Sequence, residues 1–366
     1  MAVNSYLYNF KNEINERLVD LYEGFTKLKK EGFSVDCIAP QAAIYLTVQF
    51  NLKGKKTPGG KMDKIKFPYR SDGHLAFLHV VQESGSWAKH GLEVDYDYFI
   101  SADDSHKQVA NGEVEFVSGN HLSPYAARLK GDPWVYVGQT VNLNFHRLVV
   151  QTDSAIDKIG DLKGKVVAHK GQHPGLNNWL FLKENGLDVD RGDIVMKKWR
   201  SEGKSSWEGV KVGEFDGALI TPPDDIFAKR AGLKVIEIPF QPMIWFTTIS
   251  TSYKFVQKHP DIVDRVLKGI IEGTHFFKTQ KAKTTAILEK KYSSQGWDRE
   301  VVEHVYKELA AILEKKPYPS LLAIQNVFEL AKRQAPESAK VNPMSLWDMH
   351  YLRQIDDSGF IDKLYA

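Results

Sequence analysis

The feature that most constrains the fold of this chain is a strand–loop–helix unit that begins anew near its middle. The stretch DKIGDLKGKVVAHKGQHPG, residues 157–175, runs from a polar lead-in through a short apolar strand into a polar loop. A helical pattern, LNNWLFLKENG, follows and ends at Gly186. Strand–helix alternation of this length predicts right-handed crossovers and a mostly parallel sheet. We therefore expect a second α/β half to start here.

The first half follows the same plan from Lys64 onward. Strand patterns at 64–70, 92–100 and 112–119 alternate with helical patterns, the first of them spanning 75–91 and closed by Gly91. Beyond residue 255 the chain is expected to be helical almost to its end. Two α/β halves of this kind predict two lobes, with a cleft where the carboxyl ends of their strands open.

The N-terminal segment, residues 1–62, has a different pattern, with an amphipathic helix, a strand over 42–52 and a basic linker. Its run LYEGFTKLKKEGFSVDCIAPQAAIYLTVQFNLKGK resembles part of the small C-terminal domain of a class I aminotransferase. Such an enzyme needs a Schiff-base lysine and a domain that binds pyridoxal phosphate. Nothing downstream resembles either, so we interpret the segment as an appendage and predict no transaminase activity and no cofactor.

Composition excludes several classes of function. The chain has 49 basic and 46 acidic residues and a net charge of +3, which gives no electrostatic case for binding nucleic acid or an anionic membrane. No run approaches the roughly 18–20 apolar residues that cross a bilayer. The single cysteine, Cys37, rules out an intrachain disulfide. The first thirty residues lack the apolar core of a secretory signal, so the chain as written is expected to stay in the cytosol.

Residues 64–366 carry five motifs that occur together, in order, in one known family. They are HLAFLHVVQESGSWAKHGLEVDYDYF, VANGEVEFVSGN, IDKIGDLKGKVVAHKG, VKVGEFDGALI and FVQKHPDIVDRVLKGIIEG. On these motifs the chain resembles the type II solute-binding proteins of ABC importers, in the nitrate/sulfonate/taurine and NMT1/THI5-like group.

The resemblance implies an α/β fold of two lobes joined by two crossing segments, closing on a small ligand, with a helical C-terminal region. It divides the chain into an appendage (1–62), the first part of lobe I (63–145), lobe II (146–245) and a return to lobe I (246–366). It also implies a periplasmic or extracytoplasmic location and an ABC permease as partner. The pyrimidine-forming branch carries a cysteine cluster near the second crossover, where this chain reads QPMIWFTTIST, so that activity is not expected here.

Ligand-binding side chains are expected in the loops at strand ends and in the first turns of the following helices. His121 and His173 should face each other across the cleft, and Trp245 could stack on a planar ligand or belong to the core. Asp103 and Asp104 can also be interpreted as helix caps. The candidates are Ser71, Asp72, His74, Asp103, Asp104, Asn120, His121, Gln172, His173, Thr221, Asp224 and Trp245. The three loop histidines lack the paired spacing of metal ligands, so no metal is predicted.

Three functions fit these observations. The first is a solute-binding component of an ABC importer that captures a small polar molecule without chemistry. The second is a cytosolic enzyme on the same scaffold, a decarboxylase, dehydratase or pyrimidine-forming type, with His121 or His173 as general acid or base. The third is an inactive fusion. The sequence leaves the ligand open between an anion and an amine-bearing heterocycle.

Overall fold

The computed structural model describes residues 62–199 and 205–366, and fewer positions in the first 61 residues (23, 26–27, 30, 35–37 and 48–50). The chain divides into two units, Met1–Lys61 and Met62–Ala366. In the first unit, strand β1 (Val35–Cys37) pairs antiparallel with β2 (Val48–Phe50), inside the strand predicted for 42–52. The predicted N-terminal helix and most of the aminotransferase-like run lie outside the described residues.

The larger lobe of the second unit is built on two small sheets that backbone hydrogen bonds connect. In one sheet β3 (Asp63–Lys66) pairs parallel with β4 (Leu92–Asp95). In the other, β14 (Thr248–Ser252) lies between β5 (Val117–Ser118) and β6 (Trp134–Gln139) and is antiparallel to both. Tyr69 forms bridges to Phe99, in the chain that follows β4, and to Ser118 of β5, so the two sheets adjoin each other.

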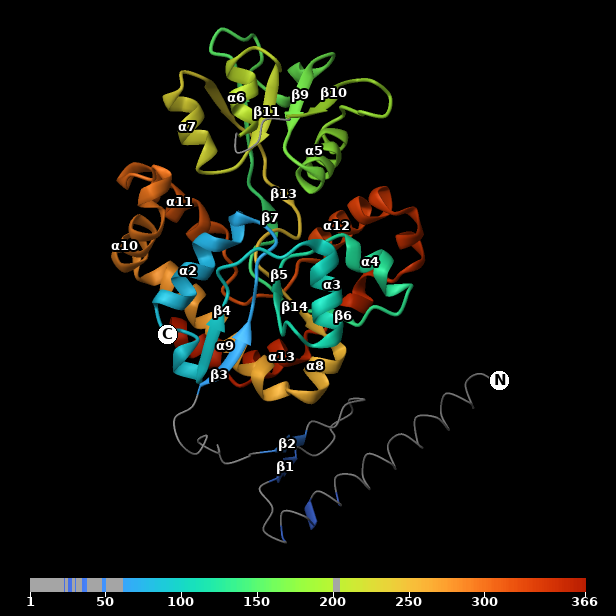
Figure 1. Ribbon diagram of the computed structural model, residues 1–366, viewed down its shortest axis with the longest axis vertical. Helices are drawn as coiled ribbons and strands as arrows, with labels where there is room; N and C mark the ends of the chain where they lie inside the picture. The colour runs from blue at the N-terminus through green and yellow to red at the C-terminus, as the bar shows by residue number, and fades with distance from the viewer. Residues whose placement is uncertain are drawn as a thin grey trace. The chain divides into compact units, whose positions relative to one another are not determined.

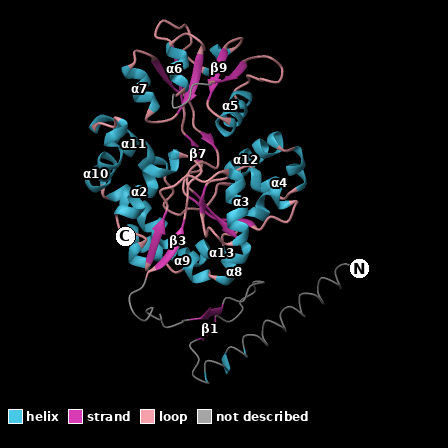
Figure 2. Ribbon diagram, in the orientation of Figure 1, coloured by secondary structure: helices cyan, strands magenta, loops and turns pink. Residues whose placement is uncertain are grey.

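The smaller lobe contains a five-stranded sheet in the order β10-β9-β11-β8-β12. Strand β8 is antiparallel to its two neighbours, while β9 runs parallel to β10 and β11. Alternate residues of β8 pack in opposite directions: Leu148 and Val150 join the cluster of helix α5, and Val149 joins that of α6 and α7. Helices therefore cover both faces (Figures 1 and 2). The strands are β8 (Arg147–Val150), β9 (Val166–His169), β10 (Val195–Lys198), β11 (Gly217–Ile220) and β12 (Lys234–Glu237), and the helices are α5 (Gln172–Glu184), α6 (Ser206–Lys211) and α7 (Asp224–Arg230).

Two chain segments cross between the lobes and pair with each other. Strand β7 (Leu143–Asn144) leads into the small lobe, and β13 (Gln241–Pro242) returns from it, antiparallel to β7 (Figure 1). Ion pairs also bridge the lobes on either side of this crossing. Arg230 of α7 lies 2.9 Å from Asp298 beside α11, and Arg333 of α12 makes two contacts of 2.6 and 2.8 Å with Asp190.

A shell of helices surrounds the large lobe. None of the described helices is long and apolar enough to cross a membrane. The helices are α2 (Leu75–Glu83), α3 (Ala102–Asn111), α4 (Ser123–Arg128), α8 (Tyr253–Lys258), α9 (Pro260–Thr279), α10 (Lys281–Tyr292), α11 (Arg299–Ile312), α12 (Leu321–Gln334), α13 (His350–Asp357) and α14 (Phe360–Tyr365).

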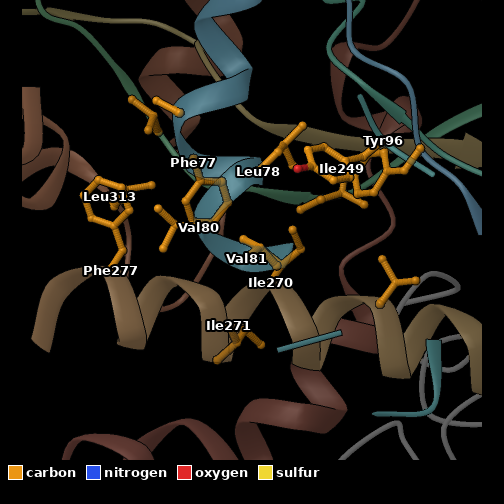
Figure 3. Packing of buried hydrophobic residues seen from close by; sticks show 14 of the residues in the cluster. Phe77, Leu78, Val80, Val81, Tyr96, Ile249, Ile270, Ile271, Phe277 and Leu313 are labelled. Atoms are coloured by element: carbon orange, nitrogen blue, oxygen red, sulfur yellow. The ribbon is translucent and has the colours of Figure 1, made fainter. Parts of the chain in front are cut away.

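The main core lies where α2 crosses α9 (Figure 3). Val81 of α2 and Ile270 of α9 are fully buried there. Two glycines of α9 make the close approach possible, because a β-carbon at Gly273 would lie 2.6 Å from a Val81 methyl group, and one at Gly269 would collide with Trp87.

The two-lobed α/β architecture with a helical C-terminal region is confirmed, but two predictions are wrong. The sheets are not mostly parallel, because β8 is antiparallel to both of its neighbours and β14 is antiparallel to both of its own. Residues 75–91 do not form one helix: α2 ends at Glu83, and Gly85, at φ +71, turns the chain. A short 3-10 turn follows and ends at Gly91, as the sequence indicated. The break lets Trp87 enter the core, where it is fully buried.

Replacing Gly273 by Ala should lower the free energy of unfolding by about 1 to 3 kcal/mol, because the added methyl group overpacks the α2–α9 contact. Helix propensity alone would change stability in the opposite direction by about 1 kcal/mol. Chemical denaturation of the wild type and the variant measures the change in the free energy of unfolding.

The matched control is the same substitution in a Val81→Ala background, which removes the methyl groups nearest to position 273. There the loss should shrink by at least about 0.5 kcal/mol. An equal loss in both backgrounds would show that the close approach to Val81 is not what requires glycine.

Candidate ligand-binding cavity

A cavity of about 420 Å³ opens where the large-lobe loops, the crossing segments and helix α5 of the small lobe meet. The loop after β3 contributes one wall, the loop after β5 a second, and the chain following β13 a third. Twelve residues line it: Arg70, Ser71, His74, Ala102, Asn120, His121, Leu122, Ser123, His173, Trp245, Phe246 and Gln334.

Three histidines from distant parts of the sequence meet in this cavity. The rings of His74 and His121 are 6.3 Å apart between centroids, and those of His121 and His173 are 5.4 Å apart. The first two are anchored by hydroxyl groups: His74 Nδ1 lies 2.7 Å from Ser118 Oγ, and His121 Nε2 lies 2.8 Å from Thr248 Oγ1. His121 and His173 thus face each other, one from each lobe.

Burial keeps these imidazoles neutral. It lowers the pKa of His74 to about 3, with further lowering by Arg70 and His173. It lowers the pKa of His173 to about 4, helped by Arg70, and the pKa of His121 falls well below 6.5 for the same main reason, with both other histidines contributing. At neutral pH each ring therefore offers one N–H donor and one acceptor nitrogen.

Arg70 supplies the one charged side chain among the lining residues. Its guanidinium donates to the carbonyl oxygen of Ile100 and lies 5.4 Å from the centre of the Phe99 ring. Burial lowers the pKa of Arg70 from 12.5, but a guanidinium stays cationic at neutral pH. Its buried Nε has no hydrogen-bond partner among the described residues. The cavity therefore holds a partly desolvated positive charge.

Two aromatic residues form the wall opposite the polar loops. Trp245 and Phe246 have ring centroids 5.4 Å apart, and Trp245 also lies 6.0 Å from His173. The backbone N–H of Trp245 donates to Val141 O, which ties this wall to the first crossing segment. Gly73 permits the contact on the other side, since a β-carbon there would lie 2.6 Å from Phe246.

The structure brings together half of the predicted site residues and leaves others outside the cavity lining. Ser71, His74, Asn120, His121, His173 and Trp245 line the cavity. Asp72, Asp103, Asp104, Thr221 and Asp224 do not, and the side chain of Gln172 lies outside the described part of the structure.

The acidic candidates each have another role or place. Asp103 and Asp104 are exposed in the first turn of α3; Ser101 is the cap of that helix, and its hydroxyl also donates to Asp104. Asp72 is exposed in the short 3-10 helix before α2. In the small lobe, Asp224 accepts a hydrogen bond from Ser205, and burial raises its pKa.

Sequence reasoning missed Arg70 and Phe246, although each adjoins a predicted residue, Ser71 or Trp245. It also missed Ser123, the first residue of α4. Among the described residues no group of three or more histidine, cysteine, aspartate or glutamate side chains is arranged to hold a metal ion.

Comparison with known proteins gives a family and a fold. The profile of the NMT1/THI5 like family matches residues 73–282. The search of curated proteins returned no match.

Solved structures with the same architecture share little sequence with the chain. The periplasmic aliphatic sulphonate binding protein SsuA from Escherichia coli is 16% identical, with a TM-score of 0.60 over 77% of this chain and 94% of that one. The alkanesulfonate-binding protein SsuA from Xanthomonas axonopodis pv. citri, bound to MOPS, is 14% identical, with a TM-score of 0.56 over 78% and 98%. The desulfurization enzyme DSZB is 15% identical, with a TM-score of 0.57 over 80% and 99%. These matches show the fold.

Acid should destabilise the second unit through the buried histidines. The unfolded chain takes up a proton at each histidine near pH 6.5, whereas folded His74 does so only near pH 3. Stability should thus fall as the pH drops below 6.5, by about 1.4 kcal/mol per pH unit for each such group. Chemical denaturation between pH 7.5 and 4.5 measures this slope.

In the variant His74→Gln the slope should be smaller by the contribution of one histidine, about 1.4 kcal/mol per pH unit. The remaining slope comes from residues such as His146, whose pKa is also lowered to about 3 by burial. His350→Gln, at an exposed position, serves as the control. A slope in His74→Gln equal to that of the wild type would show that His74 takes up a proton without cost in the folded state.

Proposed function

The chain belongs to the NMT1/THI5-like family, and from this premise we propose that residues 62–366 capture a small organic anion in the cavity, as the solute-binding component of an ABC-type importer. The cavity volume of about 420 Å³ suits a small molecule.

The observation that carries this proposal is the charge of the lining. Arg70 is its one charged side chain, and none of the four acidic residues considered from the sequence lines the cavity. A partly buried guanidinium forms strong hydrogen bonds with an oxyanion, while an ammonium ligand would be repelled. The neutral histidines add donors without adding a competing charge. An anion therefore fits better than an amine-bearing heterocycle.

The structural relatives support the same class of ligand. Two of them are described as sulfonate-binding proteins, and a DSZB structure contains biphenyl-2-sulfinic acid. Each name joins an organic group to a sulfur oxyanion. In this chain Arg70 would hold the oxyanion, and Trp245 and Phe246 would contact the organic part.

Two relatives support an importer context. The SsuA from Escherichia coli is named as periplasmic, and so is a sulfonate-binding protein from Methylobacillus flagellatus, whose name also assigns it to a putative sulfonate ABC transporter. On this basis we propose an extracytoplasmic location and an ABC permease as partner.

Substituting Arg70 by Gln should weaken binding of an organic sulfonate roughly 100-fold, about 2.7 kcal/mol, because the buried oxyanion loses its charged partner. Isothermal titration calorimetry with a panel of alkane- and arylsulfonates, and with amines of matched size, measures this. Arg353→Gln is the control, since Arg353 is exposed and pairs with Asp357 on the surface. Tighter binding of the amines than of the sulfonates would contradict the proposal.

Substituting Trp245 by Ala should weaken binding of an arylsulfonate about tenfold, about 1.4 kcal/mol, through loss of the aromatic contact. Trp245→Phe should retain most of the affinity, and methanesulfonate, which has no ring, should be affected less than the aryl ligand. An equal loss for both ligands would assign Trp245 to the support of the loop and not to ligand stacking.

A further inference from the structure

An aspartate, a histidine and a serine form a continuous hydrogen-bonded chain that ends at the cavity. Asp132 Oδ2 lies 2.8 Å from His106 Nδ1, and His106 Nε2 lies 2.8 Å from Ser123 Oγ. The three come from separate elements: His106 from the middle of α3, Asp132 from the loop before β6, and Ser123 from the start of α4. Of the three, Ser123 lines the cavity.

The surroundings fix the orientation of this chain. Asp132 Oδ1 accepts the backbone N–H of Trp134 at 3.0 Å, and the Trp134 ring packs on His106 with centroids 4.9 Å apart. The side chains of Asp132 and His106 are only 15% and 16% exposed. Because a carboxylate only accepts, Nδ1 must carry the hydrogen. In the uncharged form of the ring Nε2 is then an acceptor, and both the Ser123 hydroxyl and Asn120 Nδ2, at 3.2 Å, lie within hydrogen-bonding distance of it.

The serine is held by a strained residue next to it. Asn120 has φ +67, a left-handed backbone that no other non-glycine residue adopts in the described part of the chain. The Tyr136 hydroxyl donates a hydrogen bond to Asn120 O, and Asn120 Nδ2 donates one to Ser105 Oγ. The Ser123 hydroxyl donates to Asn120 Oδ1 at 2.7 Å, so Asn120 holds Oγ beside the imidazole, and the hydroxyl must rotate to donate to His106 Nε2 before it can react. Strain of this kind persists where the surroundings enforce it, and it is concentrated at functional sites.

We propose that Ser123, His106 and Asp132 are a catalytic triad, with which the cavity hydrolyses a small carboxylic ester that carries an anionic group. The arrangement matches the roles of nucleophile, general base and orienting carboxylate. The preference for an anionic substrate rests on the function proposed above, through Arg70; the triad itself does not. His106 thereby takes the acid–base role that the sequence had suggested for His121 or His173.

The reaction runs in two balanced steps. Ser123 Oγ attacks the ester carbonyl carbon while its proton passes to His106 Nε2. The bond from that carbon to the alcohol oxygen breaks, His106 returns the proton to this oxygen, and an acyl-Ser123 remains. Water then attacks the acyl carbon and gives its proton to His106. The bond to Oγ breaks, Ser123 regains the proton, and the carboxylic acid leaves. Asp132 keeps its charge throughout and stabilises the imidazolium.

The test is covalent labelling of the full chain with diisopropyl fluorophosphate, in which Oγ displaces fluoride from phosphorus. Intact mass and peptide mapping should show one adduct per chain, on Ser123. Labelling should disappear in Ser123→Ala and slow roughly 100-fold or more in His106→Gln. Asp132→Asn should slow it as well, since the carboxylate sets the tautomer.

His350→Gln is the matched control, because His350 also pairs with an aspartate, Asp348 at 2.5 Å, but is not among the cavity-lining residues. It should label at the wild-type rate. Thermal unfolding of each variant separates loss of chemistry from loss of fold. The wild-type protein alone can contradict the proposal. If no adduct forms on Ser123 under conditions that label a known serine esterase, the triad is overturned. An adduct formed equally fast in His106→Gln overturns it as well.

Substrate preference separates this proposal from the binding function. Mono-4-nitrophenyl succinate should be cleaved at least about tenfold better than 4-nitrophenyl butyrate, and Arg70→Gln should abolish this preference while diisopropyl fluorophosphate still labels Ser123. If labelling succeeds but no anion binds, the anion-capture function fails and the triad stands. If sulfonates bind but Ser123 does not label, the triad alone fails.

Discussion

The cavity depends on the pairing of the two segments that cross between the lobes. Strands β7 and β13 are joined by only two residue pairs, but hydrogen bonds continue the contact on the large-lobe side, from Met243 to Asn142 and from Trp245 to Val141. Asn326 of α12 further fixes Pro242. These bonds place Trp245 and Phe246 in the wall of the cavity, opposite the loops after β3 and β5. Without this crossing the polar loops of one lobe would have no aromatic wall to face.

Burial then determines the electrostatics of the cavity. Three imidazoles whose rings lie within 6.3 Å of a neighbour could not all be charged beside Arg70, and desolvation already favours their neutral forms. The cavity therefore carries one positive charge and several neutral donors. This combination differs from an amine site, which would need a carboxylate in the lining. On the proposed function, one charge in this partly desolvated setting would select the sign of the ligand.

The sequence was most informative where periodicity and strand order carry the signal. The second half that begins near residue 157 and the helical C-terminal region follow from alternation and amphipathic spacing. The positions of His121, in the loop after β5, and of His173, in the first turn of α5, follow from strand ends. The acidic candidates could not be sorted in this way, because an aspartate after a strand serves equally well in a helix turn, as Asp104 does, and in a cleft. Arg70 was not predicted as a site residue because the sequence pattern makes it the last residue of a strand. The His106–Asp132 pair needed tertiary structure, since its members lie 26 residues apart on different elements.

Binding and hydrolysis place compatible demands on one cavity. On these proposals Arg70 and the aromatic wall would contact groups of the ligand that do not react, whereas the nucleophile would be Ser123, the first residue of α4, whose hydroxyl donates to Asn120. A ligand without an ester would contact Arg70 and the aromatic wall and would be released unchanged. An ester of similar charge would make the same contacts and would also bring its carbonyl carbon within reach of Ser123. The neutral histidines near Arg70 are tied to Ser118 and Thr248, and His106 is tied to Asp132, so the two proposed functions draw on separate imidazoles. If both proposals hold, the same cavity would bind an anion with one group of side chains and cleave an attached ester with another.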